Sequence, residues 1–477
     1  MQSGIDIPLE RVVSATGGAV MNAGALRFSA AVIDGRDVPK GALFFAVKGD
    51  RFDGHDFAGQ AVAAGADGVV VARGRGASLQ GSGAATVIEV DDPVAALGKL
   101  AHAQRQAMPE CKVVAITGSN GKTTTKEMMA SILVASAGAD AVLKTEGNLN
   151  NHLGVPLTLL RLTASHRFAV IEMGMSALGE IAYLTQLARP DVGVVVSIAP
   201  VHLEGLGTIE NIARAKGEIW QGLAEGGFAV LPVDDERLQA YVANVPAERR
   251  FTFGPRTRLQ PTVGYEDVTA DQKGITVRLH LKGHTSRTGA LARIPMVGAH
   301  NASNAAAAAA AALALEVGEG SILEGLATAK PAKHRAQLVA VGDRTVLDDC
   351  YNASPLSMRA ALDALVSTTP AGHQKIAVLG DMLKLGADSP SLHRELGRYA
   401  AAHADLVIAF GALGKQIAEG AIAEAGAARV AHTDDPREAA ERAWKASKAG
   451  DVILVKASRG MKLERVIDAL FQLARGG

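Results

Sequence analysis

Short apolar runs alternate with amphipathic segments along the N-terminal part of the chain. The run at 41–49 (GALFFAVKG) is followed by a polar loop, a helix-like segment at 57–66 and a second apolar run at 67–73. Short apolar runs bounded by turn residues are typical of buried strands, and the segments between them are typical of helices. The pattern predicts a strand, loop, helix and strand, then a glycine-rich stretch, a strand TVIEV and a helix from Pro93.

The same alternation continues in the middle of the chain. An apolar run at 111–118 leads into a helix from about Lys122, and further strands are predicted at 168–174 and 191–199. Strands that alternate with helices indicate a doubly wound parallel sheet. The alanine-rich segment from Asn304 is shorter than the roughly 20 residues of a bilayer-spanning helix, so we expect a closely packed helix and no membrane span.

The C-terminal part begins with two strand-like runs within 335–349, around Gly342, which predict a hairpin. Ser354 and Pro355 then have the character of a helix N-cap and first helical residue, and three more apolar runs alternate with helical segments. A second doubly wound, Rossmann-like unit is the simplest interpretation.

Length and composition agree with an α/β protein of three domains, which we place at 1–108, 109–331 and 332–477. A chain of 477 residues is too long for one core, and 48% apolar with 4% aromatic residues favours an α/β fold rich in small aliphatic side chains. Lys plus Arg and Asp plus Glu each number 49, so no overall field attracts nucleic acid or an anionic membrane. The two cysteines and the lack of a signal-peptide pattern predict a cytoplasmic protein.

The segment GSNGKTT at 118–124 carries the clearest chemical signal. It follows a predicted strand and opens a helix, so its backbone N–H groups can converge on phosphate oxygens. Lys122 can reach the outer phosphates, and the Thr123 hydroxyl can bind Mg²⁺. The motif is a variant, because Ile116 stands where the usual pattern has glycine. An ordinary strand-to-helix turn is the alternative.

Three other residues are candidates for the same site. Glu172 and His202 each lie at or just after the end of a strand, where a solvated carboxylate and a structural histidine are the alternatives. Lys216 falls on the apolar face of a helix, so we expect it to be partly buried unless its stem reaches past the core to water. Burial lowers the pKa of a lysine, and a neutral amine can take up carbon dioxide as a carbamate.

Two asparagines, Asn301 and Asn304, lie three residues apart at a predicted helix start. Their amides can share one face and pair with an adenine edge, and helix capping is the alternative. Arg335 and Asp349 lie at the start of one predicted strand and the end of another, where either could be an ordinary surface charge.

An ordered set of segments resembles the Mur ligase family over almost the whole chain. The segments are GSNGKTTTKEM, TEGNLNNHLGVPLTLL, IEMGM, APVHLEGLG, AKGEI, GAHNASNAAAA, LDDCYNASPLSM, VLGDMLKLG and VKASRGMKLE. The N-terminal GALFFAVKGDRFDGHDFA is most similar to the branch of the family that adds a dipeptide. The resemblance implies an ATP-dependent amide-bond ligase of peptidoglycan synthesis, which joins D-alanyl-D-alanine to UDP-N-acetylmuramoyl-tripeptide through an acyl phosphate. We expect a monomer with these small-molecule substrates.

The resemblance also implies roles for individual residues. Thr123 and Glu172 match one Mg²⁺ site, and His202 with a carbamylated Lys216 matches a second; Lys122, Glu172, His202 and Lys216 are the expected catalytic residues. The expected ATP-binding residues are Gly118, Ser119, Asn120, Gly121, Lys122, Thr123, Thr124, Asn301, Asn304, Arg335 and Asp349. The expected substrate-binding residues are Arg36, Lys48, Asp53 and His55 for the UDP group in the first domain, Asn148, Asn150 and Asn151 for the muramoyl-peptide, and Tyr351 and Asn352 for the dipeptide.

Two departures from the family pattern are visible. Gly35 replaces a serine or threonine that could bond the UDP group, and Ser354 replaces an asparagine, where serine caps a helix equally well. Folylpolyglutamate synthetase is the nearest alternative enzyme, although the N-terminal domain would be superfluous for a folate substrate. A nucleotide-hydrolysing switch is an alternative of another class, but it does not require Glu172, His202 and a buried Lys216 together.

Overall fold

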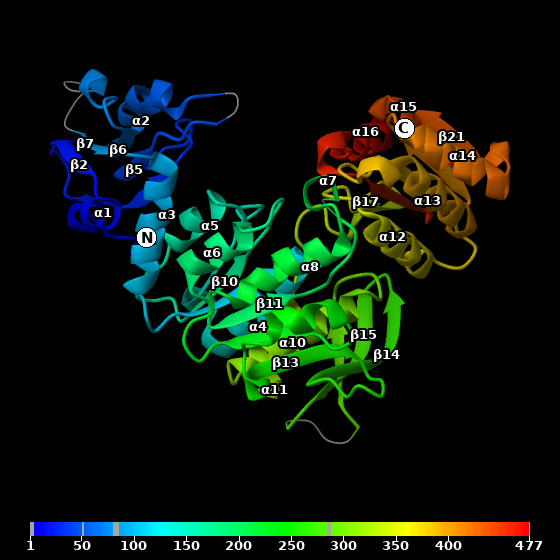
Figure 1. Cartoon of the computed structure of the whole chain (residues 1–477). Helices are drawn as coiled ribbons and strands as arrows, with labels where there is room; N and C mark the ends of the chain where they lie inside the picture. The colour runs from blue at the N-terminus through cyan, green and yellow to red at the C-terminus, as the bar shows by residue number, and fades with distance from the viewer. Residues whose placement is uncertain (1–3, 50–51, 80–84, 202, 284–287, 477) are drawn as a thin grey trace.

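The computed structural model describes residues 4–49, 52–79, 85–201, 203–283 and 288–476. Three α/β units follow one another along the chain, and Figure 1 shows the first and the third above the second, on its left and right. Their sheets span 19–90, 112–294 and 337–456. The domain limits after 108 and 331 stay predictions, and both lie between sheets. Among the described helices, none combines the length and apolar character needed to cross a bilayer.

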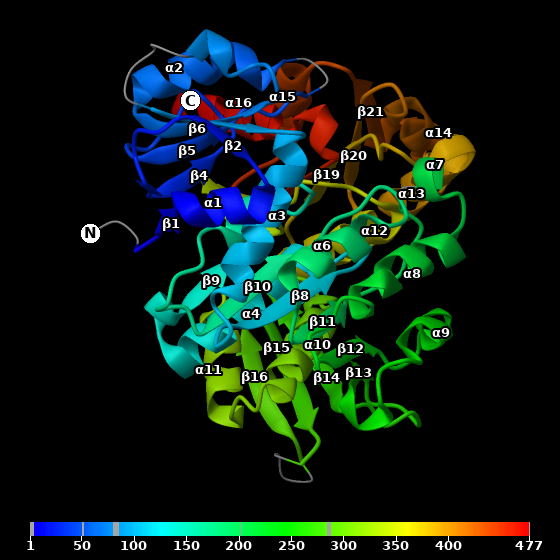
Figure 2. The ribbon, with the colours of Figure 1, turned by 60° about the vertical axis from the view of Figure 1, so that its left-hand side comes forward.

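The first sheet confirms the strands predicted near the N-terminus. Its order is β2-β7-β6-β5-β4, and all neighbours are parallel except β2, which runs antiparallel to β7. Helix α3 begins at Pro93 as expected, with Asp92 as its N-cap, and packs against α5 and α6 of the second unit. Figure 2 shows α3 running from the first unit down to the second. The elements are α1 (Leu9–Thr16), β2 (Ala19–Asn22), β4 (Ala30–Val32), β5 (Ala42–Phe45), α2 (Ala58–Ala64), β6 (Ala66–Ala72), β7 (Thr86–Val90) and α3 (Pro93–Gln106).

The second sheet has nine strands in the order β16-β15-β14-β13-β12-β11-β8-β10-β9. It is parallel from β9 to β14, as predicted, but β15 and β16 are antiparallel. Two antiparallel strands that were not predicted extend the parallel sheet at this end, because a tight turn after Asp271 lets the chain return beside itself without a crossover helix. The strands are β8 (Lys112–Thr117), β9 (Val142–Lys144), β10 (Phe168–Glu172), β11 (Val192–Val195), β12 (Phe228–Pro232), β13 (Arg250–Pro255), β14 (Val263–Asp271), β15 (Gly274–Leu281) and β16 (Ala290–Ile294).

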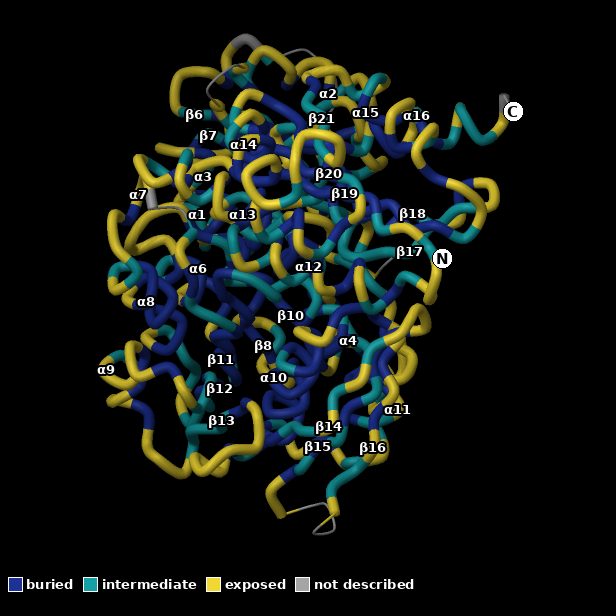
Figure 3. The backbone as a smooth tube through the Cα atoms, turned by 90° about the vertical axis from the view of Figure 1, so that its right-hand side faces the viewer, coloured by how far each residue is buried: buried dark blue, intermediate teal, exposed yellow. Residues whose placement is uncertain are grey.

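Helices cover both faces of this sheet, which explains the continuous apolar run of β8. Val113 and Ala115 belong to one core with α3, α5, α6 and α8, whereas Val114 and Ile116 belong to the other with α4, α10 and α11. Alanine lets α10 approach its neighbours closely, and α10 is buried along almost its whole length (Figure 3). The helices are α4 (Lys122–Ala137), α5 (Gly154–Leu159), α6 (Glu180–Ala188), α8 (Ile209–Gly217), α10 (Asn301–Ala314) and α11 (Glu319–Thr328).

The third sheet has the order β17-β18-β22-β19-β20-β21 and is parallel except for β17. The predicted hairpin is confirmed, since β17 and β18 pair across a turn in which Gly342 has a φ of 61°. Helix α12 begins as predicted, with Ser354 as N-cap and Pro355 first. The elements are β17 (Gln337–Val341), β18 (Arg344–Asp348), α12 (Pro355–Thr368), β19 (Lys375–Gly380), α13 (Ser389–His403), β20 (Leu406–Phe410), α14 (Gly414–Ala425), β21 (Val430–Thr433), α15 (Pro436–Ala446), β22 (Val452–Lys456) and α16 (Glu464–Gly476).

Candidate active site

The loop between β8 and α4 is held by the segment that follows β11. The Ser119 N–H donates to Ser197 O at 2.8 Å, and the Asn120 N–H donates to Ser197 Oγ at 3.0 Å. Gly121 has a φ of 83°, and a Cβ there would lie 2.3 Å from Asn304 Oδ1. Glycine is therefore required at Gly121 by backbone conformation and by space.

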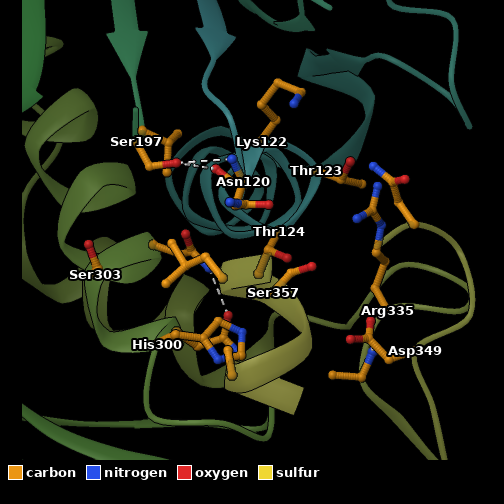
Figure 4. A pocket seen from close by; sticks show the side chains of 18 of the residues that line it. Asn120, Lys122, Thr123, Thr124, Ser197, His300, Ser303, Arg335, Asp349 and Ser357 are labelled. Atoms are coloured by element: carbon orange, nitrogen blue, oxygen red, sulfur yellow. Dashed lines mark hydrogen bonds between the residues drawn. The ribbon is translucent and has the colours of Figure 1, made fainter. Parts of the chain in front are cut away.

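A first cavity, of about 230 Å³, lies between this loop and the third unit (Figure 4). Its wall unites the loop residues with side chains from α10, the segment before β17, the end of β18 and α12. Of the predicted ATP-binding residues, only Gly118 does not line it. Those that do are Ser119, Asn120, Gly121, Lys122, Thr123, Thr124, Asn301, Asn304, Arg335 and Asp349.

The two asparagines of α10 form a connected pair. Asn301 Nδ2 donates to Val297 O, and Asn304 Nδ2 donates to Asn301 Oδ1, both at 2.8 Å. The helix is preceded by His300, which makes no side-chain capping bond, so the alternative that these asparagines cap the helix is wrong. The chain of bonds leaves Asn304 Oδ1 against the loop at Gly121. An adenine contact stays a prediction.

Arg335 and Asp349 are both engaged within the third unit. The Arg335 guanidinium lies 4.3 Å from the centre of the Tyr351 ring, which holds it by a cation–π contact. Asp349 Oδ1 accepts the Ala336 N–H at 3.1 Å, and Asp349 Oδ2 pairs with Lys456 Nζ. Neither residue is an ordinary surface charge.

Lys456 is a site residue that the sequence analysis missed. It ends β22, is 2% exposed and lines the first cavity. Besides the pair with Asp349, its ammonium donates to Asn352 O at 3.0 Å. The sequence feature that could have indicated Lys456 is a lysine at the end of an apolar strand. It lies within VKASRGMKLE, a segment that contributed to the family resemblance but was given no role of its own.

A second cavity, of about 620 Å³, adjoins the first. It collects predicted residues of three kinds: the catalytic Lys122, Glu172 and Lys216, the muramoyl-peptide residues Asn150 and Asn151, and the dipeptide residues Tyr351 and Asn352. Lys122, Arg335 and Asn352 line both cavities, so the two meet at these side chains.

Glu172 is buried at the end of β10, beside β8, as the sequence predicts. Its Oε1 accepts Asn150 Nδ2 at 2.8 Å, and its backbone N–H donates to Thr145 Oγ1 at 2.9 Å. Within the described residues, Oε2 has no hydrogen-bond partner, and the nearest ammonium, that of Lys126, lies 3.9 Å away. Asn150 therefore orients this carboxylate, a role that the sequence did not indicate.

Burial lowers the pKa of both lysines of the second cavity. Burial lowers the pKa of Lys122, which Arg335 lowers further and Glu172 raises, and its ammonium donates to Gly118 O at 2.7 Å. Lys216 in α8 is 2% exposed, which confirms the predicted burial. Burial, with the Lys122 ammonium nearby, lowers the pKa of Lys216 well below the usual value. His202 lies outside the described residues.

The predicted UDP-binding residues of the first unit are occupied by local contacts. Arg36 forms an exposed ion pair with Asp34 at 2.6 Å. Asp53 accepts the His55 backbone and ring N–H groups, and His55 Nε2 accepts the Ala72 N–H, so this pair also shapes the loop. The backbones of Lys48 and Asp53 pair in an isolated antiparallel β-bridge. None of the predicted four lines either cavity. Their UDP contacts stay predictions.

The other two predicted muramoyl-peptide residues differ in their surroundings. Asn151 Oδ1 accepts the Gly154 N–H at 2.9 Å and so supports the start of α5, whereas Asn148 is exposed and lines neither cavity.

Both cysteines are buried and reduced. Burial raises the pKa of Cys111 to about 11 and raises the pKa of Cys350 as well, where Asp348 adds to the effect. The Cys350 thiol donates to Asp348 Oδ1 at 3.2 Å, while His334 Nδ1 lies in hydrogen-bond contact with Asp348 Oδ2 at 2.7 Å. These bonds agree with a packing role for Cys350.

Comparison with known proteins assigns the family. The family models described as Mur ligase family, catalytic domain, Mur ligase middle domain, and Mur ligase, glutamate ligase domain match 27–105, 116–312 and 334–459. The UDP-N-acetylmuramoyl-tripeptide–D-alanyl-D-alanine ligase of Bacillus subtilis is 38% identical over 92% of each chain. The crystal structure of MurF from Acinetobacter baumannii is 32% identical, covers 98% of this chain and 99% of its own, and has a TM-score of 0.85. MurF ligase from Thermotoga maritima, solved in complex with ADP, is 29% identical, with coverages of 94% and 98% and a TM-score of 0.78.

Fold and site thus define an α/β enzyme whose phosphate loop adjoins two connected cavities. The chain belongs to the Mur ligase family and is an ATP-dependent ligase.

Proposed function

We propose that the chain joins D-alanyl-D-alanine to UDP-N-acetylmuramoyl-tripeptide, using ATP, and so supplies the UDP-linked pentapeptide for peptidoglycan synthesis. The observation that carries this proposal is the meeting of the two cavities at Lys122, Arg335 and Asn352. A nucleotide in the first cavity and a carboxylate in the second would meet at two cationic side chains. Relatives that carry this substrate name match most of the chain, which favours this branch over a folate ligase or a switch.

The chemistry requires two steps. The terminal carboxylate of the tripeptide attacks the γ-phosphorus of ATP, the bond to ADP breaks, and an acyl phosphate forms. The amine of the dipeptide then attacks the acyl carbon, phosphate leaves, and the nitrogen loses a proton. Lys122 and Arg335 would offset the repulsion between the two anions in the first step.

The donor set of the second cavity suits Mg²⁺. Glu172 Oε2 is buried without a hydrogen-bond partner among the described residues, and Asn150 holds the carboxylate from the other side. Oxygen donors of this kind are those that Mg²⁺ prefers. We propose that Thr123 and Glu172 hold one ion and that His202 and Lys216 hold a second. Bound Mg²⁺ would neutralise charge on the phosphate oxygens.

We also propose that Lys216 works as a carbamate. Burial lowers the pKa of its amine and so favours the neutral form, which would add to the carbon of CO₂ and lose one proton, so that a neutral amine becomes an anionic ligand. A cationic Lys216 beside Lys122 would repel the metal that the chemistry needs.

The proposal is tested by phosphate release from ATP by the purified protein with Mg²⁺, the UDP-linked tripeptide and D-alanyl-D-alanine, each omitted in turn. We expect release to require both substrates, with the pentapeptide as product by mass spectrometry. Release without the dipeptide, or with folate and glutamate instead, would reject this substrate assignment.

Location and assembly follow as proposals. The two buried, unpaired cysteines suit a reducing cytoplasm. We also propose that the protein is a monomer, which light scattering would check.

Gly121→Ala tests the phosphate loop. The left-handed backbone costs a non-glycine residue about 1–2 kcal/mol, and the new Cβ would also clash with Asn304. We expect the affinity for ADP, measured by calorimetry, to fall at least about tenfold. Gly138→Ala is the control, since Gly138 also has positive φ but has open space around its Cβ and lies at the far end of α4. Equal affinity in the two variants would contradict the steric argument.

Asn150→Ala tests the orientation of Glu172. Groups that orient a metal ligand typically change metal affinity about 10–100-fold when they are removed. We expect the Mg²⁺ concentration for half-maximal rate to rise about tenfold, while the KM for D-alanyl-D-alanine changes little. An unchanged Mg²⁺ dependence would show that Asn150 serves the substrate rather than the carboxylate.

A further inference from the structure

A partly buried hydrogen bond joins the phosphate loop to the third unit. Ser354 Oγ, at the start of α12, donates to Asn120 Oδ1 at 2.9 Å, although the two residues are 234 positions apart in the chain. Ser354 is 3% exposed and lies behind Asn120, which lines the first cavity. Ser354 therefore reaches the cavity through Asn120.

The bond fixes the direction of the Asn120 amide. Because Oδ1 accepts from Ser354, the two N–H groups of Nδ2 must point elsewhere. Nδ2 is buried, and among the described residues it has no hydrogen-bond partner. The backbone N–H of Asn120 already donates to Ser197 Oγ. A buried donor left over in a phosphate loop is suited to an anionic oxygen.

Ser354 is itself held in place. The Ser357 N–H donates to Ser354 Oγ at 3.3 Å, and the Ser354 N–H donates to Ser357 Oγ at 2.9 Å, which completes a capping box. The cap uses the Ser354 oxygen as an acceptor, and the Ser354 Oγ donor lies closer to Asn120 Oδ1, at 2.9 Å, than to its other acceptor, Ser357 Oγ, at 3.1 Å. One hydroxyl thus serves the helix and the loop at once.

We propose that Ser354 is a positioning residue for phosphoryl transfer, which holds the Asn120 amide so that its nitrogen donates to a phosphate oxygen of the nucleotide. The contact exists only while α12 rests on the loop, so transfer is linked to the docking of the third unit. This inference deepens the proposed function and rests on it.

A double-mutant cycle tests the proposal. The four proteins are wild type, Ser354→Ala, Asn120→Ala and the double variant, each measured for kcat, KM for ATP and affinity for ADP. Each single substitution is expected to lower kcat about tenfold, and the double variant is expected to be no slower than Asn120→Ala. Ser354→Asn, which keeps both a cap and an N–H donor, is expected to recover most of the rate.

Ser357→Ala separates capping from positioning, since it weakens the box but leaves the Ser354 hydroxyl on Asn120. A loss in Ser357→Ala equal to that in Ser354→Ala, or single losses that multiply in the double variant, would overturn the proposal. Thermal unfolding of each variant shows whether it is folded. If the wild-type protein binds ADP but makes no pentapeptide, the proposed function is rejected instead. The double-mutant cycle, with ADP affinity as its readout, would then still measure the coupling between Ser354 and Asn120.

Discussion

Lys216→Ala is expected to lower the rate of ligation about a thousandfold or more while the protein stays folded. Removal of the amine would remove the proposed carbamate, and with it an anionic ligand in a cavity that otherwise has Lys122 and Arg335 nearby. Loss of charge stabilisation at a reacting phosphate has effects of this order. Pentapeptide formation by mass spectrometry measures the rate, and circular dichroism with thermal unfolding checks the fold. Added bicarbonate is not expected to rescue the variant.

Two further variants sharpen this test. Lys216→Arg is expected to fail as well, because a guanidinium stays charged and does not form a carbamate. Lys415→Ala, at an exposed position of α14, is the control and should keep full activity. Full activity in Lys216→Ala would refute the carbamate role, and carbon-13 NMR with labelled bicarbonate would look for the carbamate directly.

Lys456→Met is expected to lower the free energy of unfolding by about 3 kcal/mol and to raise the KM for ATP at least about tenfold. Removing one partner of a buried ion pair leaves the other charge uncompensated, which typically costs about 3–5 kcal/mol. Asp349 would lose the ammonium that holds it at the wall of the first cavity. Urea unfolding and steady-state kinetics measure the two effects.

A second substitution distinguishes the pair from the packing of the lysine stem. Lys456→Met combined with Asp349→Asn removes both charges and is expected to recover part of the stability, but not the KM. Lys445→Met, at an exposed position of α15, should change stability by less than about 0.5 kcal/mol. Unchanged stability and KM in Lys456→Met would contradict the role given to this pair.

Strands buried on both faces could be predicted from sequence because the central residues of such a strand are apolar and form a continuous run. This holds for β8, β10 and β19. The outer strands of the second sheet were not predicted, because β15 alternates between buried and half-buried positions and gives a weaker pattern. The buried position of Lys216 was predictable as well, because the helical periodicity that places it on the apolar face of α8 is a local pattern in the sequence.

The contacts that complete the site were not predictable, because they join distant parts of the chain. Asn150 and Glu172 are 22 positions apart, and Lys456 and Asp349 are 107 apart. A motif gives the type of residue, but the partner depends on how the sheets are placed. Most of the ATP-binding residues that the resemblance implied line the first cavity, whereas the four for the UDP group line neither cavity, and the contact of Asn150 with Glu172 was not among its implications.

The burial of both cysteines gives the chain a practical property. A thiol reacts with maleimides and similar labels as the thiolate, and both Cys111 and Cys350 are shielded from solvent with raised pKa values. The natural protein should therefore react very slowly with such reagents at neutral pH. Single cysteines introduced on exposed surfaces of the first and third units could carry a fluorophore pair without replacing any native residue. Energy transfer between them would then report any change in the distance between the two units during turnover.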